Sequence, residues 1–266
     1  MMTDLFMLQL LLTFIAGSAW IFLTVLAGTH FGSKIGGFIG GLPSTALLSF
    51  FFIGYTQSPE MASKATTVFP LAIGVSGIFL VVYAWLSRQG FMLALFTGLV
   101  IWFVLSLLIV LFHPESFTMN IINYILIMFC AYYILEKKLS IKSIANEKMN
   151  HTSKHLVVRS VFGGMVIMLT VFIARIGGIF LGGIFAAFPA MFIATLTITY
   201  QVHGIDFSRA MTKPLLVTGM ITVVVYAIAL RYLYLSAGLY LGTILSIIIS
   251  AISAYLTLRF ILHRLK

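Results

Sequence analysis

The chain has 266 residues, of which 61% are hydrophobic and 8% charged, and its formal net charge is +10. A soluble domain normally carries about 25% charged residues, so this composition excludes a soluble globular protein. The apolar runs are too continuous for the alternating strands of a membrane barrel and are typical of membrane helices. The positive charge does not indicate nucleic-acid binding, because the basic residues lie in short segments between apolar runs.

Hydropathy predicts an all-α integral membrane protein with about nine transmembrane helices. The first apolar run is preceded by Asp4 and by no basic residue, so we interpret it as a helix rather than a signal peptide. The predicted spans are Leu5–Leu26, Ile35–Tyr55, Val68–Leu86, Gly90–Phe112, Met119–Leu135, Leu156–Ala174, Gly177–Tyr200, Pro214–Tyr234 and Gly238–Leu262.

The distribution of basic residues predicts how these spans are oriented. Nine spans put the N-terminus outside and the C-terminus in the cytoplasm of a cell (inner) membrane. Of the 16 Lys and Arg residues, only Lys64, Arg175 and Arg231 then lie outside. Without the fifth span, the basic linker and the basic residues of the first half would lie on opposite sides of the membrane. The linker Glu136–Arg159 is expected to lie on the anionic cytoplasmic leaflet of the bilayer.

One motif occurs twice in corresponding apolar runs. GGFIGGLP at Gly36–Pro43 recurs as GGIFAAFP at Gly182–Pro189. The same alignment pairs Glu60 with Asp206 and, after a two-residue gap, Pro70 with Pro214. The order of small residues, proline, acid and proline therefore predicts an internal repeat.

The repeat predicts a 4+1+4 organisation. Residues 1–112 form the first four-helix unit, residues 113–155 a connecting helix with the basic linker, and residues 156–266 the second four-helix unit. Because an odd number of spans separates equivalent helices, the second unit is expected to be inverted in the membrane. Inverted repeats are a recurring design of transporters.

In a transporter built from repeats, a pair of apolar segments interrupted by small residues and proline is the best sequence indication of the substrate site. A proline inside a helix frees backbone groups, which must face neighbouring helices or a wet cavity. A half-helix that begins beyond the proline presents free N–H groups. The candidate substrate-binding residues are Pro43, Ser44, Thr45, Ser49, Pro189 and Thr195. The alternative is that the small residues only pack helices, the prolines only kink them, and the hydroxyls bond to their own backbone.

No acidic residue lies in the middle of a predicted span, so a buried proton-carrying carboxylate is not expected. Glu60 with Lys64, and Asp206 with Arg209, are candidate gates on opposite membrane faces; the alternative is a local ion pair at the start of a helix. The histidines lie in loops or at span ends, so we expect no enzyme activity, metal or cofactor. The one cysteine, Cys130, lies in an apolar run and is expected to be buried.

The segments GGLPST at Gly40–Thr45 and AAFPAM at Ala186–Met191 resemble the small GlpM-type bacterial inner-membrane proteins. The resemblance covers each half separately and implies a fused pair of such units. That family has been linked to efficient exopolysaccharide (alginate) production, and the resemblance supplies no catalytic or binding residue.

Together these patterns predict a transporter or flippase for a small or lipid-linked substrate, working by alternating access around the two interrupted helices. The alternative function is a non-transporting scaffold in a cell-envelope assembly complex. The expected partners are the bilayer, with its anionic cytoplasmic leaflet, and an unidentified substrate. Nucleic acid is not expected, and a homo-oligomer is left open.

Overall fold

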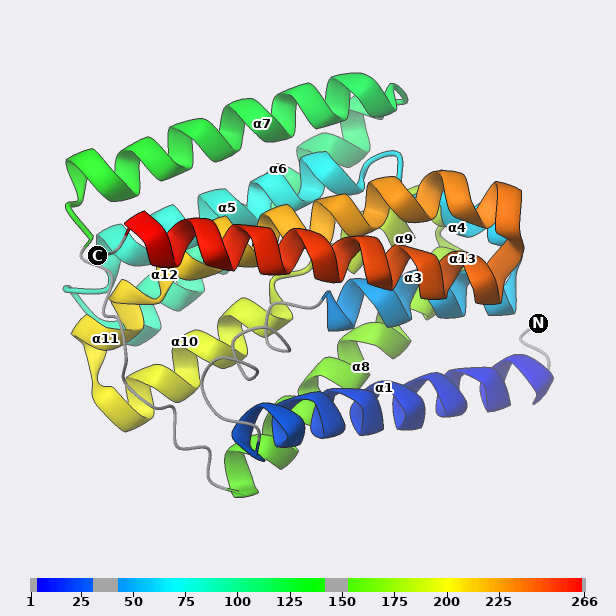
Figure 1. Cartoon of the computed structure of the whole chain (residues 1–266), viewed down its shortest axis with the longest axis horizontal. Helices are drawn as coiled ribbons and strands as arrows, with labels where there is room; N and C mark the ends of the chain where they lie inside the picture. The colour runs from blue at the N-terminus through cyan, green and yellow to red at the C-terminus, as the bar shows by residue number, and fades with distance from the viewer. Residues whose placement is uncertain (1–3, 31–42, 142–152, 265–266) are drawn as a thin grey trace.

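A computed structural model describes residues 4–30, 43–141 and 153–264, which contain helices and no strand (Figure 1). The helices are α1 (Asp4–His30), α3 (Ser44–Thr56), α4 (Pro59–Ala65), α5 (Phe69–Leu86), α6 (Phe91–Phe112), α7 (Phe117–Tyr133), η1 (Ile134–Lys138), α8 (Ser153–Ile176), α9 (Ile179–Ala186), α10 (Ala190–His203), α11 (Ile205–Ala210), α12 (Thr212–Pro214), η2 (Leu215–Gly219) and α13 (Met220–Arg264). The predicted all-α fold is confirmed.

Seven helical stretches within the described residues are long and apolar enough to cross a membrane. The last of them, Ile205–Thr257, has 53 residues, and its chain reverses direction at Gly238, where φ is 72° (Figure 1). The connecting helix predicted at Met119–Leu135 is longer than expected, because Phe117–Lys138 forms one apolar stretch. The predicted second span is described only from Pro43 onward, where it continues as the shorter helix Ser44–Thr56.

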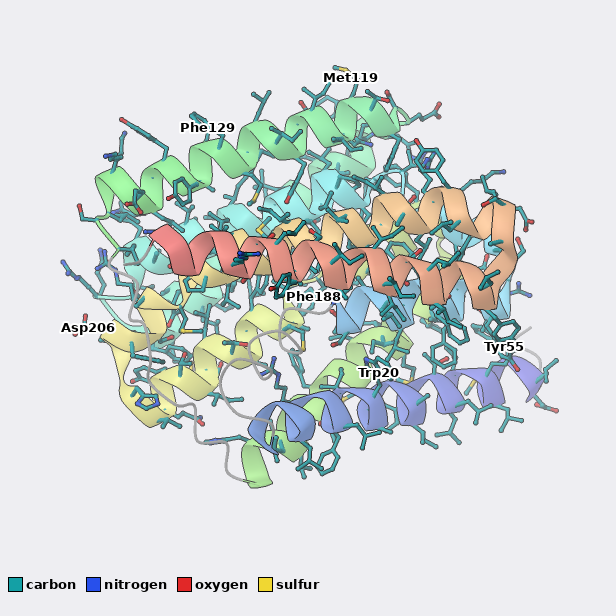
Figure 2. The ribbon with its side chains drawn as sticks, in the orientation of Figure 1. Trp20, Tyr55, Met119, Phe129, Phe188 and Asp206 are labelled. Atoms are coloured by element: carbon teal, nitrogen blue, oxygen red, sulfur yellow. The ribbon has the colours of Figure 1, made fainter. Side chains whose placement is uncertain are left out.

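The outer helices expose large apolar side chains, as a surface in contact with lipid does. Phe112 is 81% exposed and Phe129 is 71% exposed, and Figure 2 shows Phe129 and Met119 pointing outward from α7. The prediction that Cys130 is buried is wrong, because this residue is exposed. Hydropathy alone does not show which side of α7 faces inward; its buried residues are Phe117, Asn120, Tyr124 and Ala131.

The two halves meet where α1 crosses α8. A Cβ atom on Gly17 would press against Cδ1 of Ile167, and a Cβ atom on Gly163 would press against Cδ1 of Ile21. The spacing from Gly17 to Gly163, and from Ile21 to Ile167, equals the spacing from Pro43 to Pro189. A reciprocal contact of this kind is what a two-fold axis between equivalent helices produces.

The helices that follow the two prolines run in opposite directions. α3 runs toward the end of the bundle that holds α4 and the turn at Gly238, and α10 runs toward the opposite end, which holds α11 (Figure 1). We call these the α4 end and the α11 end. α1 begins at the α4 end, and α13 ends at the α11 end (Figure 1).

The glycines of the second motif copy allow close helix packing. A Cβ atom on Gly182 would clash with Ala174 of α8, and one on Gly183 would clash with the carbonyl of Ala65 in α4. Small residues that let backbones approach in this way are typical of membrane helix interfaces. In the first copy, Gly36, Gly37, Gly40 and Gly41 lie outside the described residues.

We expect Gly183→Ala to lower the free energy of unfolding by about 1–3 kcal/mol, because the added methyl group meets rigid backbone. Gly219→Ala is the matched control, since its methyl group would meet only ring atoms of Phe192, at 3.3 Å or more. Thermal unfolding of both variants in detergent measures the difference. Equal midpoints for the two variants would contradict this packing.

Candidate functional site

The two prolines occupy equivalent places in the structure. Pro43 immediately precedes α3, with φ −76° and ψ 52°, and Pro189 immediately precedes α10, with φ −76° and ψ 38°. Both prolines are buried. Each helix therefore begins inside the bundle, with its first N–H groups turned toward the break, as the sequence predicts.

The carbonyl of Ala187, two residues before Pro189, is satisfied by a side chain from the first half. Ser76 Oγ of α5 donates a hydrogen bond to the Ala187 oxygen, at 2.8 Å. The indole N–H of Trp102 in α6 donates to the same Ser76 oxygen, at 3.0 Å. Both side chains are fully buried, and the Trp102 ring also contacts Phe188 edge-on, with centroids 5.2 Å apart. A serine and a tryptophan thus supply the donor that the interrupted helix lacks.

The predicted hydroxyl residues lie near the two breaks on different helices. Ser49 in α3 and Thr195 in α10 have the same spacing as the two prolines, and they are 1% and 5% exposed. Ser49 Oγ has no hydrogen-bond partner within the described part of the chain. Ser44 is buried at the first position of α3, and Thr45 is half-buried.

The structure does not gather these residues into one cluster. α3 packs on α1, α4, α8, α9 and α13, whereas α10 packs mainly on α8 and α11. Later hydroxyls of α10 bond within their own helix: Thr197 donates to the Ile193 carbonyl and Thr199 to the Thr195 carbonyl. The candidate residues therefore form two separate half-sites, on α3 and on α10, rather than one composite pocket.

The predicted gate residues lie at the two ends of the bundle. Glu60 and Lys64 are exposed on α4. The Ser58 side chain, with the Glu60 backbone N–H and Lys64, holds the pKa of the Glu60 carboxyl below its usual value. Asp206 is exposed at the start of α11, and its labelled position in Figure 2 is at that end of the molecule.

Arg209, in contrast, is buried and donates hydrogen bonds to two backbone carbonyls. Its Nε donates to the Ala84 carbonyl at 2.8 Å, and its Nη2 donates to the Leu139 carbonyl at 3.5 Å. The neighbouring Ser208 donates to the Leu196 carbonyl, so the Tyr83 hydroxyl donates to Ser208, at 2.7 Å. These bonds join α11 of the second half to α5 of the first.

At the α4 end an equivalent set of bonds joins α4 to α13. Ser63 Oγ donates to the Arg231 carbonyl at 2.7 Å. The Arg231 Nη1 group donates to the Ser63 carbonyl at 3.2 Å and to Thr67 Oγ1 at 2.9 Å. Its guanidinium carbon lies 4.3 Å from the centre of the Phe117 ring. Each half therefore attaches its short helix to a long helix of the other half.

Sequence reasoning missed this arrangement, although a signal is present. The segment SKATT at residues 63–67 recurs as SRAMT at residues 208–212. In both segments a threonine hydroxyl bonds back to the short helix, although from different positions of the segment: Thr66 donates to the Ser63 carbonyl and Thr212 to the Arg209 carbonyl. The two segments are spaced one residue closer than the two prolines, so they match the predicted repeat only with a one-residue shift.

The comparisons with known proteins add one finding. Residues 156–263 match the model of a family described as "Protein of unknown function (DUF3147)". No curated protein and no solved structure matches the chain.

We expect Ser76→Ala to lower the free energy of unfolding by about 1–3 kcal/mol, because it leaves the buried Ala187 carbonyl and the buried Trp102 indole without their partner. Thr197→Ala is the control, since it removes a bond to a carbonyl already within the α10 ladder. Thermal unfolding followed by tryptophan fluorescence reports both stability and the Trp102 environment. A larger loss for Thr197→Ala would contradict the bonding described.

Proposed function

We propose that this protein is a multi-pass membrane transporter or flippase for a small or lipid-linked substrate, built from two four-helix units in opposite orientations. The observation that carries the proposal is the pair of buried prolines, each followed by a half-helix, with the two half-helices running to opposite ends of the bundle. Discontinuous helices that point in opposite directions are how inverted-repeat transporters build a site that opens alternately to each face.

The reciprocal contact between α1 and α8 supports this proposal. Equivalent residues of the two units meet there, Gly17 against Ile167 and Gly163 against Ile21, as an axis in the membrane plane requires. The family match supports it too, because it begins at residue 156, where the second unit is predicted to begin. We accordingly place the units at residues 1–112 and 156–266, with residues 113–155 connecting them.

The two half-sites differ in chemistry, which bears on the substrate. The break before α3 is followed by Ser44 and Thr45, whereas the break before α10 is followed by Ala190 and Met191. A molecule that contacted both would meet a polar wall and an apolar wall, which suits an amphipathic or lipid-linked substrate. The proposed location is the inner membrane, with the N-terminus outside. The GlpM-type resemblance of each half suggests exopolysaccharide production as the process served.

The second candidate is a non-transporting scaffold in an envelope-assembly complex. The observation that favours it is the tight packing of Gly182 and Gly183 against α8 and α4, because close packing is all that a structural role needs. In that case the prolines only determine where helices bend or end, and no water enters the breaks before α3 and α10.

Cysteine accessibility separates the two functions. On a Cys130→Ser background, Thr45→Cys and Met191→Cys place one thiol at equivalent positions beyond each proline. The transporter predicts that water-soluble maleimide labels both, in intact cells or in inverted vesicles, because a substrate pathway holds water.

Arg88→Cys, at an exposed end, is the positive control, and the lipid-facing Phe129→Cys is the negative control. If Thr45→Cys and Met191→Cys stay unlabelled from both sides while Arg88→Cys reacts, the transporter function is wrong and the scaffold is favoured.

A further inference from the structure

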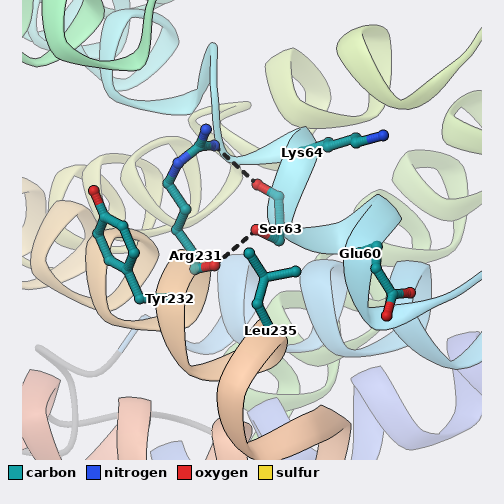
Figure 3. A pocket seen from close by; sticks show the side chains of 6 residues that line it. All are labelled: Glu60, Ser63, Lys64, Arg231, Tyr232 and Leu235. Carbon is teal, nitrogen blue, oxygen red and sulfur yellow. Dashed lines mark hydrogen bonds between the residues drawn. The ribbon is translucent and has the colours of Figure 1, made fainter.

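A pocket of about 390 Å³ opens at the α4 end of the bundle. Its lining comes from both halves of the protein (Figure 3). The lining residues are Glu60, Ser63, Lys64, Arg231, Tyr232 and Leu235. The candidate site described above does not include it, and sequence reasoning placed only Glu60 and Lys64 here.

The pocket has a net positive charge, because two basic residues and one acidic residue line it. Within the part of the chain that the structure describes, neither Arg231 nor Lys64 has a carboxylate at ion-pair distance. Arg231 is half-buried and donates to neutral oxygens of Ser63, Thr66 and Thr67. Glu60 is the one acidic residue in the lining, and it is fully exposed at the start of α4. A half-buried guanidinium without a carboxylate favours an anion beside it.

The same pocket has an apolar side. Leu235 is 59% exposed and Tyr232 is 60% exposed, one turn apart on α13 just before the turn at Gly238. Figure 3 shows both beside Arg231, with Lys64 and Glu60 on the other side of Ser63. Tyrosine at the end of a membrane helix is typical of the interface at which lipid headgroups lie. A ligand with a phosphate and an adjoining acyl chain fits both parts of this lining.

At the opposite end of the molecule, the basic residues of α11 and α12 have partners within the protein. There Arg209 is buried and donates to two backbone carbonyls, and Lys213 forms an ion pair with Glu136. The basic residue of the SRAMT segment is turned into the protein, whereas that of SKATT is exposed. The pocket described here lies at the α4 end.

We propose that this pocket binds the phosphate group of an anionic phospholipid, with Lys64 and Arg231 supplying the positive charge and Tyr232 and Leu235 contacting the glycerol and acyl region. Glu60 lowers the affinity of the site for the anion by repulsion. The site holds a lipid at the junction of α4 and α13, which belong to different halves, so an occupied site strengthens that junction. This binding does not depend on whether the protein transports a substrate.

The test uses full-length protein in nonionic detergent, titrated with phosphatidylglycerol, with phosphatidylcholine or with inorganic phosphate. The rise in thermal unfolding midpoint gives the apparent affinity. Phosphatidylglycerol is expected to raise the midpoint, and the other two probes to raise it much less. Lys64→Gln should weaken phosphatidylglycerol binding about five-fold, since one basic residue near an anionic lipid contributes on that order. Glu60→Gln should strengthen it.

Arg88→Gln is the matched control, because it removes one exposed positive charge at the other end of the bundle. Its affinity for phosphatidylglycerol should equal that of the unaltered protein. Equal losses for Lys64→Gln and Arg88→Gln would overturn the proposal, because the effect would then be general charge attraction. Stabilisation by phosphatidylcholine or inorganic phosphate as large as that by phosphatidylglycerol would overturn the assignment to an anionic lipid.

Discussion

Where a membrane helix is interrupted, the last carbonyls before the break lose their usual donors, and lipid offers no water to replace them. The packing around Pro189 follows from this constraint. Ser76 of α5 donates a hydrogen bond to the Ala187 carbonyl, and the indole N–H of Trp102 in α6 donates to the Ser76 oxygen. The second half of the protein therefore depends on side chains of the first half at the point where its own helix is broken. Because the Ala187 carbonyl is hydrogen-bonded in this way, the chain can form two short helices here instead of one continuous span.

The same dependence between halves recurs at both ends of the bundle. At one end Arg209 of α11 bonds to the last turn of α5, and at the other Arg231 of α13 bonds to α4. With the α1–α8 crossing in the middle, the two halves touch through equivalent elements at three levels. A rocking motion of one half against the other would have to release one set of end bonds while keeping the other set. The bonds involve hydroxyls, carbonyls and arginine, and such polar contacts can exchange partners without exposing an isolated charge to lipid.

The coarse architecture was predictable from sequence because composition and proline position determine it. The helices restart at Ser44 and Ala190, directly after the two prolines, and the connecting helix forms where hydropathy and basic residues required it. The contacts were not predictable, because their partners lie far apart in the chain: Ser76 and Ala187, or Ser63 and Arg231. Nor does hydropathy alone show which face of a membrane helix is inward, which is why the burial of Cys130 was predicted wrongly. The similarity of the SKATT and SRAMT segments is visible in the sequence. Its role becomes clear only from the hydrogen bonds that these segments make to the other half of the protein.

The central claim is that the two units have opposite orientations in the membrane, and Glu60 and Asp206 test it most directly. The proposed repeat pairs these two residues, both are exposed, and each lies in the first turn of a short helix at one end of the bundle. Single cysteines at these two positions on a Cys130→Ser background can be labelled with an impermeant maleimide in intact cells and in inverted vesicles. The account predicts that Glu60→Cys reacts only from outside and Asp206→Cys only from the cytoplasmic face. Labelling of both from the same face would contradict it.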